Sequence, residues 1–321
     1  RNFAKYAWAK EAWETDLPST THINWDRLYA VNSLNSTASG NRSKYVIEER
    51  RVDQNDLNFA VNAKWNPVKF LTVNGGLSYK WNRTEYYKIL DDLLGGDYYV
   101  NIDQFAERDF AAYPTMIQND LDYYLRNGAA QTLAQGDKYG YDYYAHVRRA
   151  EAWASGRFTF GGFEATVAGR LGYSKFWREG LLRKGLFPGL DDNGNPFTYN
   201  GEVITKYDQI DGRPITSKGE SDKKDFLTGS GKINLGYFIS GGHRIYADAA
   251  YITEAPTFNQ AFISPRTRNT VMPDLKTIKT LTADINYAYS NSGYDVRVTG
   301  FYTSIKDQTD VMSFYDESQN S

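Results

Sequence analysis

A long alternating hairpin near the end of the chain constrains the fold more than any other feature of the sequence. Its arms run over residues 277–289 and 294–306, with a polar turn between them. Apolar or tyrosine side chains occupy every second position of each arm, so one face is apolar and the other polar. Each arm has about 11 to 13 residues, against about 5 to 6 in an ordinary strand and about 9 to 11 in a tilted strand that crosses a bilayer. The hairpin therefore predicts two membrane-spanning β-strands.

Three earlier stretches of the chain repeat this pattern. The four hairpins close at short turns, predicted at Asn66–Lys69, Gly161–Gly162, Ser240–His243 and Ser290–Gly293. Long polar segments separate the hairpins, over residues 85–144, 179–223 and 254–274, and residues 1–42 show no strand alternation. Outer-membrane barrels have short periplasmic turns and longer extracellular loops. We expect an all-β chain that contributes about eight strands to an antiparallel transmembrane β-barrel, with these four segments as extracellular loops.

The alternation also assigns single side chains to one face or the other. A slip of one residue would exchange the two faces, so the assignment is sharp. The residues expected to face lipid are Val167, Leu235, Ala249, Ile285 and Val298. The residues expected to face the lumen are Arg170, Asn234, Asp248, Asn286 and Arg297.

Composition agrees with barrel strands. The mean hydropathy is −0.62 and no stretch approaches 18 consecutive apolar residues, which excludes membrane-spanning helices. Barrel strands average to such values because every second residue faces the lumen. The 26 tyrosines and 7 tryptophans suit membrane interfaces. A net charge of −2 argues against a nucleic-acid partner, and the absence of cysteine excludes disulfides and thiol chemistry.

No motif in the sequence predicts catalysis, a metal or a cofactor. His22, His146 and His243 fall in separate segments without ligand spacing. The stretch that begins at Asp191 resembles a calcium loop, but Pro196 stands where the sharp turn requires glycine, so a polar turn is the better interpretation. We therefore expect no enzyme activity.

Loops on a rigid scaffold are the better candidates for binding. Six residues in the expected loops are candidates for ligand capture at the cell surface: Arg266, Arg268, Asn269, Tyr141, Tyr143 and Tyr144. The alternative is that these Tyr- and Arg-rich loops only pack together over the barrel mouth.

Several segments resemble the β-barrel of TonB-dependent outer-membrane receptors. The resemblance is carried by Trp65–Leu77, Glu254–Phe258, Phe262–Asn269 and the strand pair Asp274–Asp307. It implies a barrel of about 22 strands with a plugged lumen, in a protein of the Gram-negative outer membrane that imports scarce nutrients with energy from TonB. The chain has room for about eight strands and shows no plug domain, so we expect a central part of a longer polypeptide. The implied partners are outer-membrane lipid, the plug and TonB through segments outside this chain, and a surface lipoprotein is a further candidate.

Two other functions stay open at this point. A passive porin-type channel would share the strands and the loop asymmetry, and a soluble β-sheet protein that binds glycans would share the alternation alone. The imported substrate stays open as well: an iron chelate, cobalamin, a glycan and a peptide all fit the family resemblance.

Overall fold

One large antiparallel sheet dominates the computed structural model, which describes residues 2–209 and 211–309. Its long strands follow one another in chain order, and each pairs with the next. They are β3 (Ile47–Val68), β4 (Leu71–Asp92), β7 (Lys138–Phe160), β8 (Phe163–Gly180), β12 (Lys224–Ile239), β13 (His243–Glu254), β14 (Ile278–Ser290) and β15 (Asp295–Lys306). The short β11 (Gly219–Glu220) adds to the end of β8. The predicted all-β antiparallel class is confirmed, and the sheet is open, with β3 and β15 at its edges.

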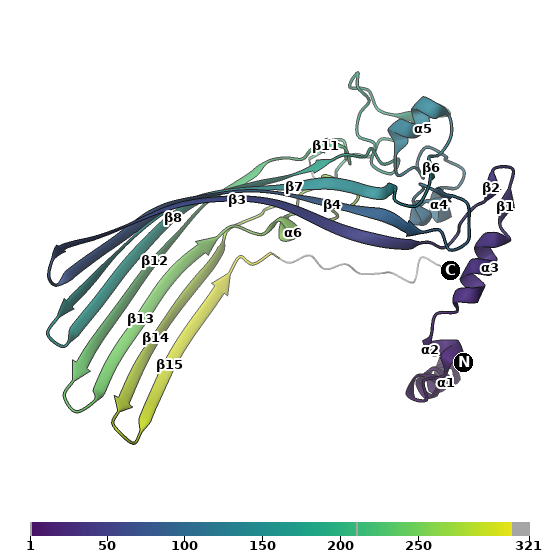
Figure 1. Ribbon diagram of the computed structural model, residues 1–321. Coiled ribbons are helices and arrows are strands. Elements are labelled where there is room, and N and C mark those ends of the chain that lie inside the picture. Colours follow the sequence, from purple (N-terminus) through teal and green to yellow (C-terminus); the bar gives the residue numbers. More distant parts are fainter. Residues whose placement is uncertain (1, 210, 310–321) are drawn as a thin grey trace.

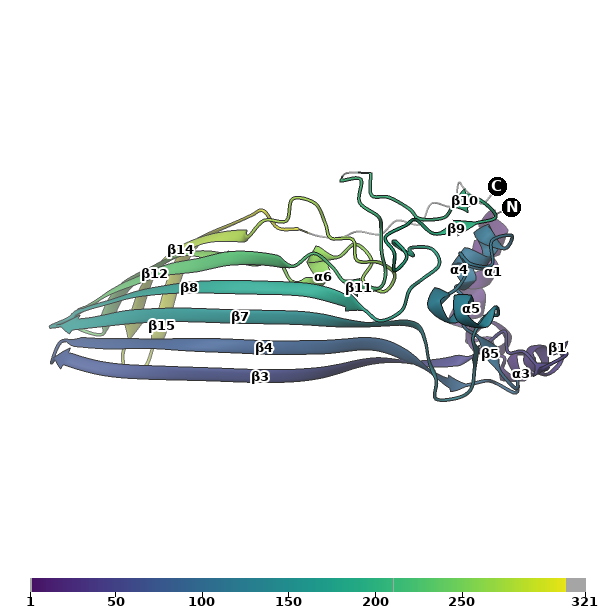
Figure 2. The same ribbon diagram turned by 90° about the horizontal axis from the view of Figure 1, so that it is seen from above.

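Most of the helices and short strands lie at one end of this sheet, whereas the last helix, α6 (Phe258–Ala261), lies under its middle (Figures 1 and 2). The other helices are α1 (Asn2–Glu14), α2 (Pro18–Thr21), α3 (Trp25–Ser33), α4 (Gln104–Phe110) and α5 (Leu121–Asn127). Three two-residue ladders accompany them: β1 (Ser36–Thr37) with β2 (Gly40–Asn41), β5 (Tyr99–Val100) with β6 (Thr132–Leu133), and β9 (Thr198–Tyr199) with β10 (Glu202–Val203). Among the described residues, no helix has both the length and the apolar character that a membrane crossing requires.

The tight turns gather at the opposite end of the sheet (Figure 1). The turn at Gly161–Gly162 is confirmed, and those after β12 and β14 lie within a residue of their predicted places. The prediction for the first turn was wrong, because β3 continues to Val68 and the chain reverses at residues 69–70. The register shifts between Trp65 and Val68, so Pro67 stands at a bulge, where a missing N–H costs no ladder hydrogen bond.

The loop predicted over residues 85–144 is shorter in the structure. Strand β4 runs to Asp92 and β7 begins at Lys138, so the connection spans residues 93–137. Tyr86 stacks on Tyr143 with ring centroids 5.1 Å apart, which shows that the tyrosine run belongs to paired strands. The other two long connections, 181–223 and 255–277, agree with the predicted segments to within a few residues.

The register places the two predicted sets of side chains on opposite faces. Val167 pairs with Ile233, which pairs in turn with Ala249. On the other face Asn234 pairs with Asp248, and their side chains are hydrogen-bonded at 2.7 Å. Since directly paired residues share a face, the same pairings put Leu235, Ile285 and Val298 with Val167, and Arg170, Asn286 and Arg297 with Asn234. We call these the apolar face and the polar face.

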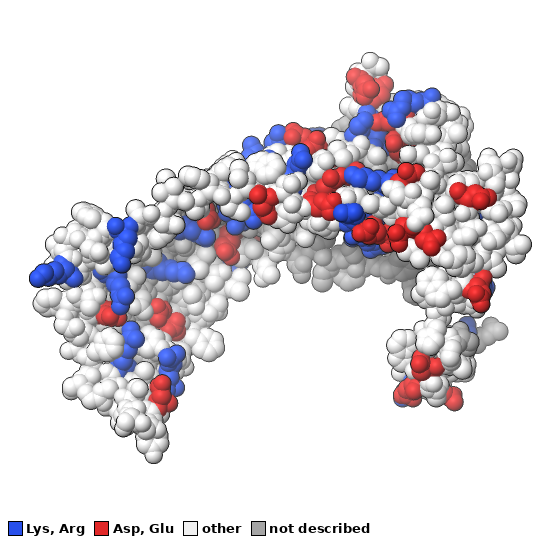
Figure 3. Space-filling model, viewed as in Figure 1, with Lys and Arg blue, Asp and Glu red and all other residues white. Residues whose placement is uncertain are grey.

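The sheet bends into an arch, and the segment that carries α6 lies in its hollow (Figure 1). Phe262 and Ala261 of this segment pack on Phe176 of β8, which lies on the polar face because it is six residues beyond Arg170. Acidic and basic side chains are interleaved along the arch and over the loop end (Figure 3). The polar face is therefore the concave one, and it is partly covered at the loop end.

Candidate ligand-capture site at the loop end

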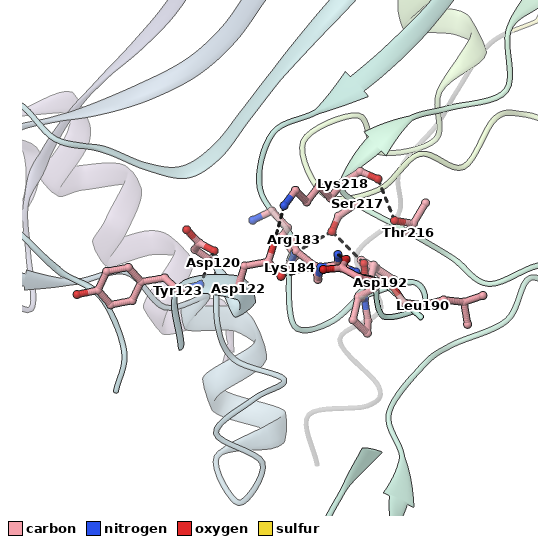
Figure 4. Close-up of polar contacts among 12 residues, drawn as sticks. Asp120, Asp122, Tyr123, Arg183, Lys184, Leu190, Asp192, Thr216, Ser217 and Lys218 are labelled. Atoms are coloured by element: carbon pink, nitrogen blue, oxygen red, sulfur yellow. Dashed lines mark hydrogen bonds and ion pairs between the residues drawn. The ribbon is translucent and has the colours of Figure 1, made fainter. Parts of the chain in front are cut away.

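The long connections at the loop end are bound to one another by polar contacts (Figure 4). Asp122 of α5 accepts a hydrogen bond from Arg183 Nε at 2.7 Å and one from Lys218 Nζ at 2.6 Å. Arg183 also donates to the backbone oxygen of Leu190 at 2.6 Å, while the backbone N–H of Lys184 donates to Ser217 Oγ at 2.8 Å. Two connections that lie far apart in sequence, 93–137 and 181–223, are thus held as one body.

Besides the packing on Phe176, one guanidinium of strand β8, that of Arg178, binds the connection 255–277. Arg178 is 2% exposed, and its Nε donates to the backbone oxygen of Pro265 at 2.6 Å. Its Nη1 donates to the backbone oxygen of Ser217 at 2.8 Å and to Asn269 Oδ1. The side-chain amide of Asn269 in turn donates to Gly219 O at 3.1 Å. These contacts fix the position of the loop over the polar face.

A cavity of about 400 Å³ lies between this loop body and the ends of β3, β4 and β7. Its walls combine strand residues of the polar face with residues of all three long connections. The lining cations are Lys44, Arg50, Lys88, Lys184 and Arg266; the lining acids are Glu48 and Asp103; the lining tyrosines are Tyr45, Tyr99, Tyr139 and Tyr141. Volumes of about 300 to 1,000 Å³ are typical of small-ligand sites.

Glu48 organises the strand wall of this cavity. Its carboxylate accepts hydrogen bonds from Lys88 Nζ and Arg50 Nε, each at 2.7 Å, and from the hydroxyl of Tyr139 at 2.8 Å. Lys88 Nζ also lies 4.1 Å from the centroid of the Tyr139 ring. One carboxylate therefore balances two cations, and the remaining lining cations leave the cavity with an excess of positive charge.

Lys184 lies under the cavity floor and is 6% exposed. Its ammonium donates to Asn119 Oδ1 at 2.8 Å and to the backbone oxygen of Gly140. Burial lowers the pKa of Lys184 to about 8, and the charge of Asp103 opposes that shift. The floor thus carries a positive charge near neutral pH that is held by neutral oxygens.

The structure brings two of the six predicted capture residues together. Arg266 and Tyr141 both line the cavity, with the guanidinium carbon 5.3 Å from the ring centroid. Tyr143 and Asn269 are buried in packing and loop contacts instead, and Arg268 lies over the ring of Phe187.

Tyr144 lies on the opposite face from Tyr141 and Tyr143, because successive side chains of a strand alternate. The grouping of the three tyrosines was wrong because that segment is strand and not loop.

Sequence reasoning missed the residues that give the cavity its charge. Glu48 and Arg50 belong to the charged run Glu48–Arg51, whose polarity hides the alternation, although the register places both on the polar face. Asn32 of α3 was also missed. It is fully buried, and its amide donates to Tyr45 O at 2.8 Å and to Leu93 O at 2.9 Å, which joins the N-terminal region to the end of β4. No sequence pattern could have singled it out.

A second and larger cavity, of about 640 Å³, lies between residues 208–226 and 269–275. Two of its six lining acids, Asp211 and Asp222, are bound by Arg213 at 2.6 and 2.8 Å. In the described part of the chain no group of three or more histidine, aspartate or glutamate side chains is arranged to hold a metal ion. Asp191 uses one carboxylate oxygen to accept backbone N–H groups of Asn193 and Asn195, as in a polar turn.

Two solved structures are similar to this chain. The solved copper transporter OprC superposes with a TM-score of 0.50 at 11% identity, over 80% of this chain and 32% of that chain. The ferric yersiniabactin uptake receptor FyuA from Yersinia pestis superposes with a TM-score of 0.45 at 13% identity, over 84% of this chain and 31% of that chain. The chain thus spans about a third of the length of these two proteins.

The search of curated protein sequences found no match. The family model for the TonB dependent receptor-like beta-barrel matches residues 4–319. The chain belongs to the family of TonB-dependent receptor β-barrels.

Proposed function

We propose that this chain forms part of the barrel wall of an outer-membrane importer driven by TonB. The observation that carries the proposal is the exposed apolar face of the sheet. Leu77, Leu171 and Val298 on this face are 62%, 67% and 63% exposed, and they come from three different strands. A contiguous apolar surface of this extent requires a cover. Lipid hydrocarbon provides one, and the concave polar face then lines the lumen.

The rest of the receptor follows from family membership. A barrel of about 22 strands would close the open edges at β3 and β15 and would hold a plug in its lumen. The plug and the segment that TonB grips belong to the parent polypeptide. In this orientation the tight turns face the periplasm and the loop body faces the cell exterior.

The cavity at the loop end supports capture of an anionic ligand that carries aromatic groups. Its cations exceed its acids, and its tyrosines offer faces for stacking. Arg266 and Tyr141 form the part of its wall that combines both properties. Anionic metal chelates with aromatic donors have this chemistry, whereas a neutral glycan makes no use of the positive charge.

The membrane assignment can be tested with the purified full-length receptor. We expect it to require detergent and to insert into liposomes. A receptor that stays monodisperse in water without detergent would refute the membrane wall and favour the soluble alternative.

Transport can be tested separately in cells that express the receptor. The probes are a ferric tris-catecholate complex and a neutral maltooligosaccharide. We expect accumulation of the ferric complex that is lost when TonB is deleted. Accumulation that persists without TonB would point to a passive channel, and uptake of the neutral sugar alone would refute the assignment of an anionic ligand.

A further inference from the structure

On the apolar face, β4, β7 and β8 carry four successive rows of paired residues. From the tight-turn end toward the loop end these rows change from apolar to aromatic and cationic. The first row is Leu77, Ala152 and Leu171, and the second is Tyr79, Ala150 and Tyr173. The third is Trp81, Arg148 and Lys175, and the fourth is Arg83, His146 and Trp177. Arg148 lies about twelve residues from the turn that ends β7. At about 3.3 Å per residue and a tilt near 45°, this corresponds to roughly 28 Å of height, about the top of an apolar band roughly 25 Å tall.

Arg148 is fixed between two tryptophans. Its guanidinium carbon lies 4.7 Å from the ring centroid of Trp81 and 5.2 Å from that of Trp177. Its Nη1 donates to the backbone oxygens of Asn82 and Val147, at 2.7 and 3.0 Å. The remaining donors of this planar group point to no carboxylate within ion-pair distance in the described residues.

Arg83 also lies over an aromatic ring. Its guanidinium carbon lies 4.7 Å from the ring centroid of Tyr144, and its Nε is buried without a hydrogen-bond partner. The acids of the next row are occupied, since Glu85 is bound by Lys138 and Glu179 lies 2.8 Å from His146 Nε2. The guanidinium groups of Arg83 and Arg148 are therefore both without a carboxylate partner among the described residues.

Arg83 and Arg148 are diagonal neighbours on adjacent strands, so their Cα atoms lie about 7 to 8 Å apart. Like charges on neighbouring positions of one sheet face disfavour each other, and an anion bound between the two guanidinium groups would offset this repulsion. Guanidinium groups suit phosphate because they bind it with two parallel hydrogen bonds and are weakly hydrated. The aromatic faces hold both groups in place, which reduces the entropy lost when an anion binds.

We propose that Arg83 and Arg148 bind the phosphate of a lipid headgroup in the outer leaflet. This inference rests on the proposed membrane orientation of the apolar face. The rows below the arginines favour a lipid over free phosphate, because acyl chains would continue onto Leu77, Leu171 and the flanking tyrosines. The site would attach the receptor to its surrounding lipid on the side where ligands arrive.

The test compares bisphosphorylated and phosphate-free lipid A on the detergent-solubilised full-length receptor by native mass spectrometry. We expect the wild type to bind the phosphorylated lipid at least about tenfold more tightly, since charge-assisted bidentate hydrogen bonds distinguish the two lipids. The Arg83→Gln, Arg148→Gln double variant should lose this preference. The control Arg149→Gln changes the adjacent residue, which is exposed and lies on the polar face, and should keep it.

Three results would overturn the proposal: equal binding of both lipids by the wild type, an unchanged preference in the double variant, or displacement of the lipid by millimolar inorganic phosphate. The last result would mean a site for free phosphate. The wild-type comparison needs no variant, so it stands even if the double variant fails to fold. Insertion into phosphatidylcholine liposomes is measured in parallel: a receptor that inserts but ignores the phosphate refutes this inference alone, whereas one that does not insert refutes the membrane orientation.

Discussion

Arg178 of β8 donates a hydrogen bond from Nη1 to the side-chain oxygen of Asn269, although 91 positions separate them along the chain. The same guanidinium reaches Ser217 O and Pro265 O. One strand residue therefore holds two of the long connections. This explains why a loop that seemed suited to ligand capture by composition is largely occupied in packing.

Replacement of Asn269 by alanine should loosen this loop. The change leaves one N–H donor of the buried Arg178 without its acceptor and removes the hydrogen bond from the Asn269 side-chain amide to Gly219 O. We expect the free energy of local opening to fall by about 1 to 3 kcal/mol. We expect amide hydrogen exchange in residues 255–277 to become about 5- to 100-fold faster. The control Arg268→Gln changes the preceding residue, which contacts Phe187 and not Arg178. Equal protection from hydrogen exchange in Asn269→Ala and the wild type would show that the contact between Arg178 and Asn269 does not hold this loop.

The stability of the loop end should depend on pH through Lys184. The pKa of Lys184 is about 8 in the folded protein and 10.5 ordinarily, so between these values only the unfolded chain binds the proton. Stability therefore rises with pH in this window, by up to about 1.4 kcal/mol per unit, and is flat below pH 8 for this group. Urea titrations of the liposome-inserted receptor at pH 7.5, 9 and 10 would measure it. As the pH increases, the free energy of unfolding of the wild type should rise relative to that of Lys184→Met. A difference that does not change with pH would contradict the lowered pKa of Lys184.

The cavity should lose affinity for an anionic aromatic ligand when its wall is neutralised. We expect Arg266→Gln to weaken binding of a ferric tris-catecholate complex about 10- to 100-fold, since hydrogen bonds to charged groups contribute about 1.5 to 3 kcal/mol. Tyr141→Leu should weaken binding less, because a stacking contact contributes about 0.5 to 1.5 kcal/mol. Tyr144→Leu lies on the other face and should leave it unchanged. Fluorescence quenching measures these affinities. If Tyr144→Leu loses as much affinity as Arg266→Gln, the cavity is not the binding site.

The sheet was accessible from sequence because alternation is a local property. Every second residue of β14 and β15 is apolar or tyrosine, and parity alone carries each side chain to a face. The upper ends of β4 and β7 were missed for the same reason. Above Tyr79 and Trp81 both faces carry polar and aromatic residues, so the period of two is no longer visible in hydropathy.

The candidate site could be predicted only in part, because it depends on contacts between distant segments. The loop residue Arg266 was singled out, but its neighbours Glu48 and Lys88 come from strands more than a hundred residues earlier. Tyr143 has the same composition cues as Tyr141, and only the stacking of Tyr86 and Phe258 against it shows that it is core. The contacts of Arg178 with Ser217, Pro265 and Asn269 depend on how two long connections fold back over β8, and no local sequence pattern predicts this.

The assignment of the two faces is tested most sharply by adjacent arginine substitutions in β8. Val167 lies on the apolar face and is 51% exposed, while Thr166 lies on the polar face. An arginine that faces lipid costs about 2 to 4 kcal/mol at mid-membrane and about 0 to 1 kcal/mol near an interface. Val167 is about four residues from its turn, so we expect an intermediate cost of roughly 1 to 3 kcal/mol for Val167→Arg.

Thr166→Arg should cost clearly less than this, because its side chain would enter a wet lumen. It would lie opposite Arg157, whose charge is balanced by Glu164 at 2.9 Å. Reversible unfolding of the full-length receptor in liposomes measures both variants. The Asn234 position, which pairs with Thr166, supplies a second comparison on the neighbouring strand: Leu235→Arg against Asn234→Arg. If arginine at 166 costs as much as arginine at 167, and arginine at 234 as much as at 235, the assignment of the apolar face to the membrane is wrong.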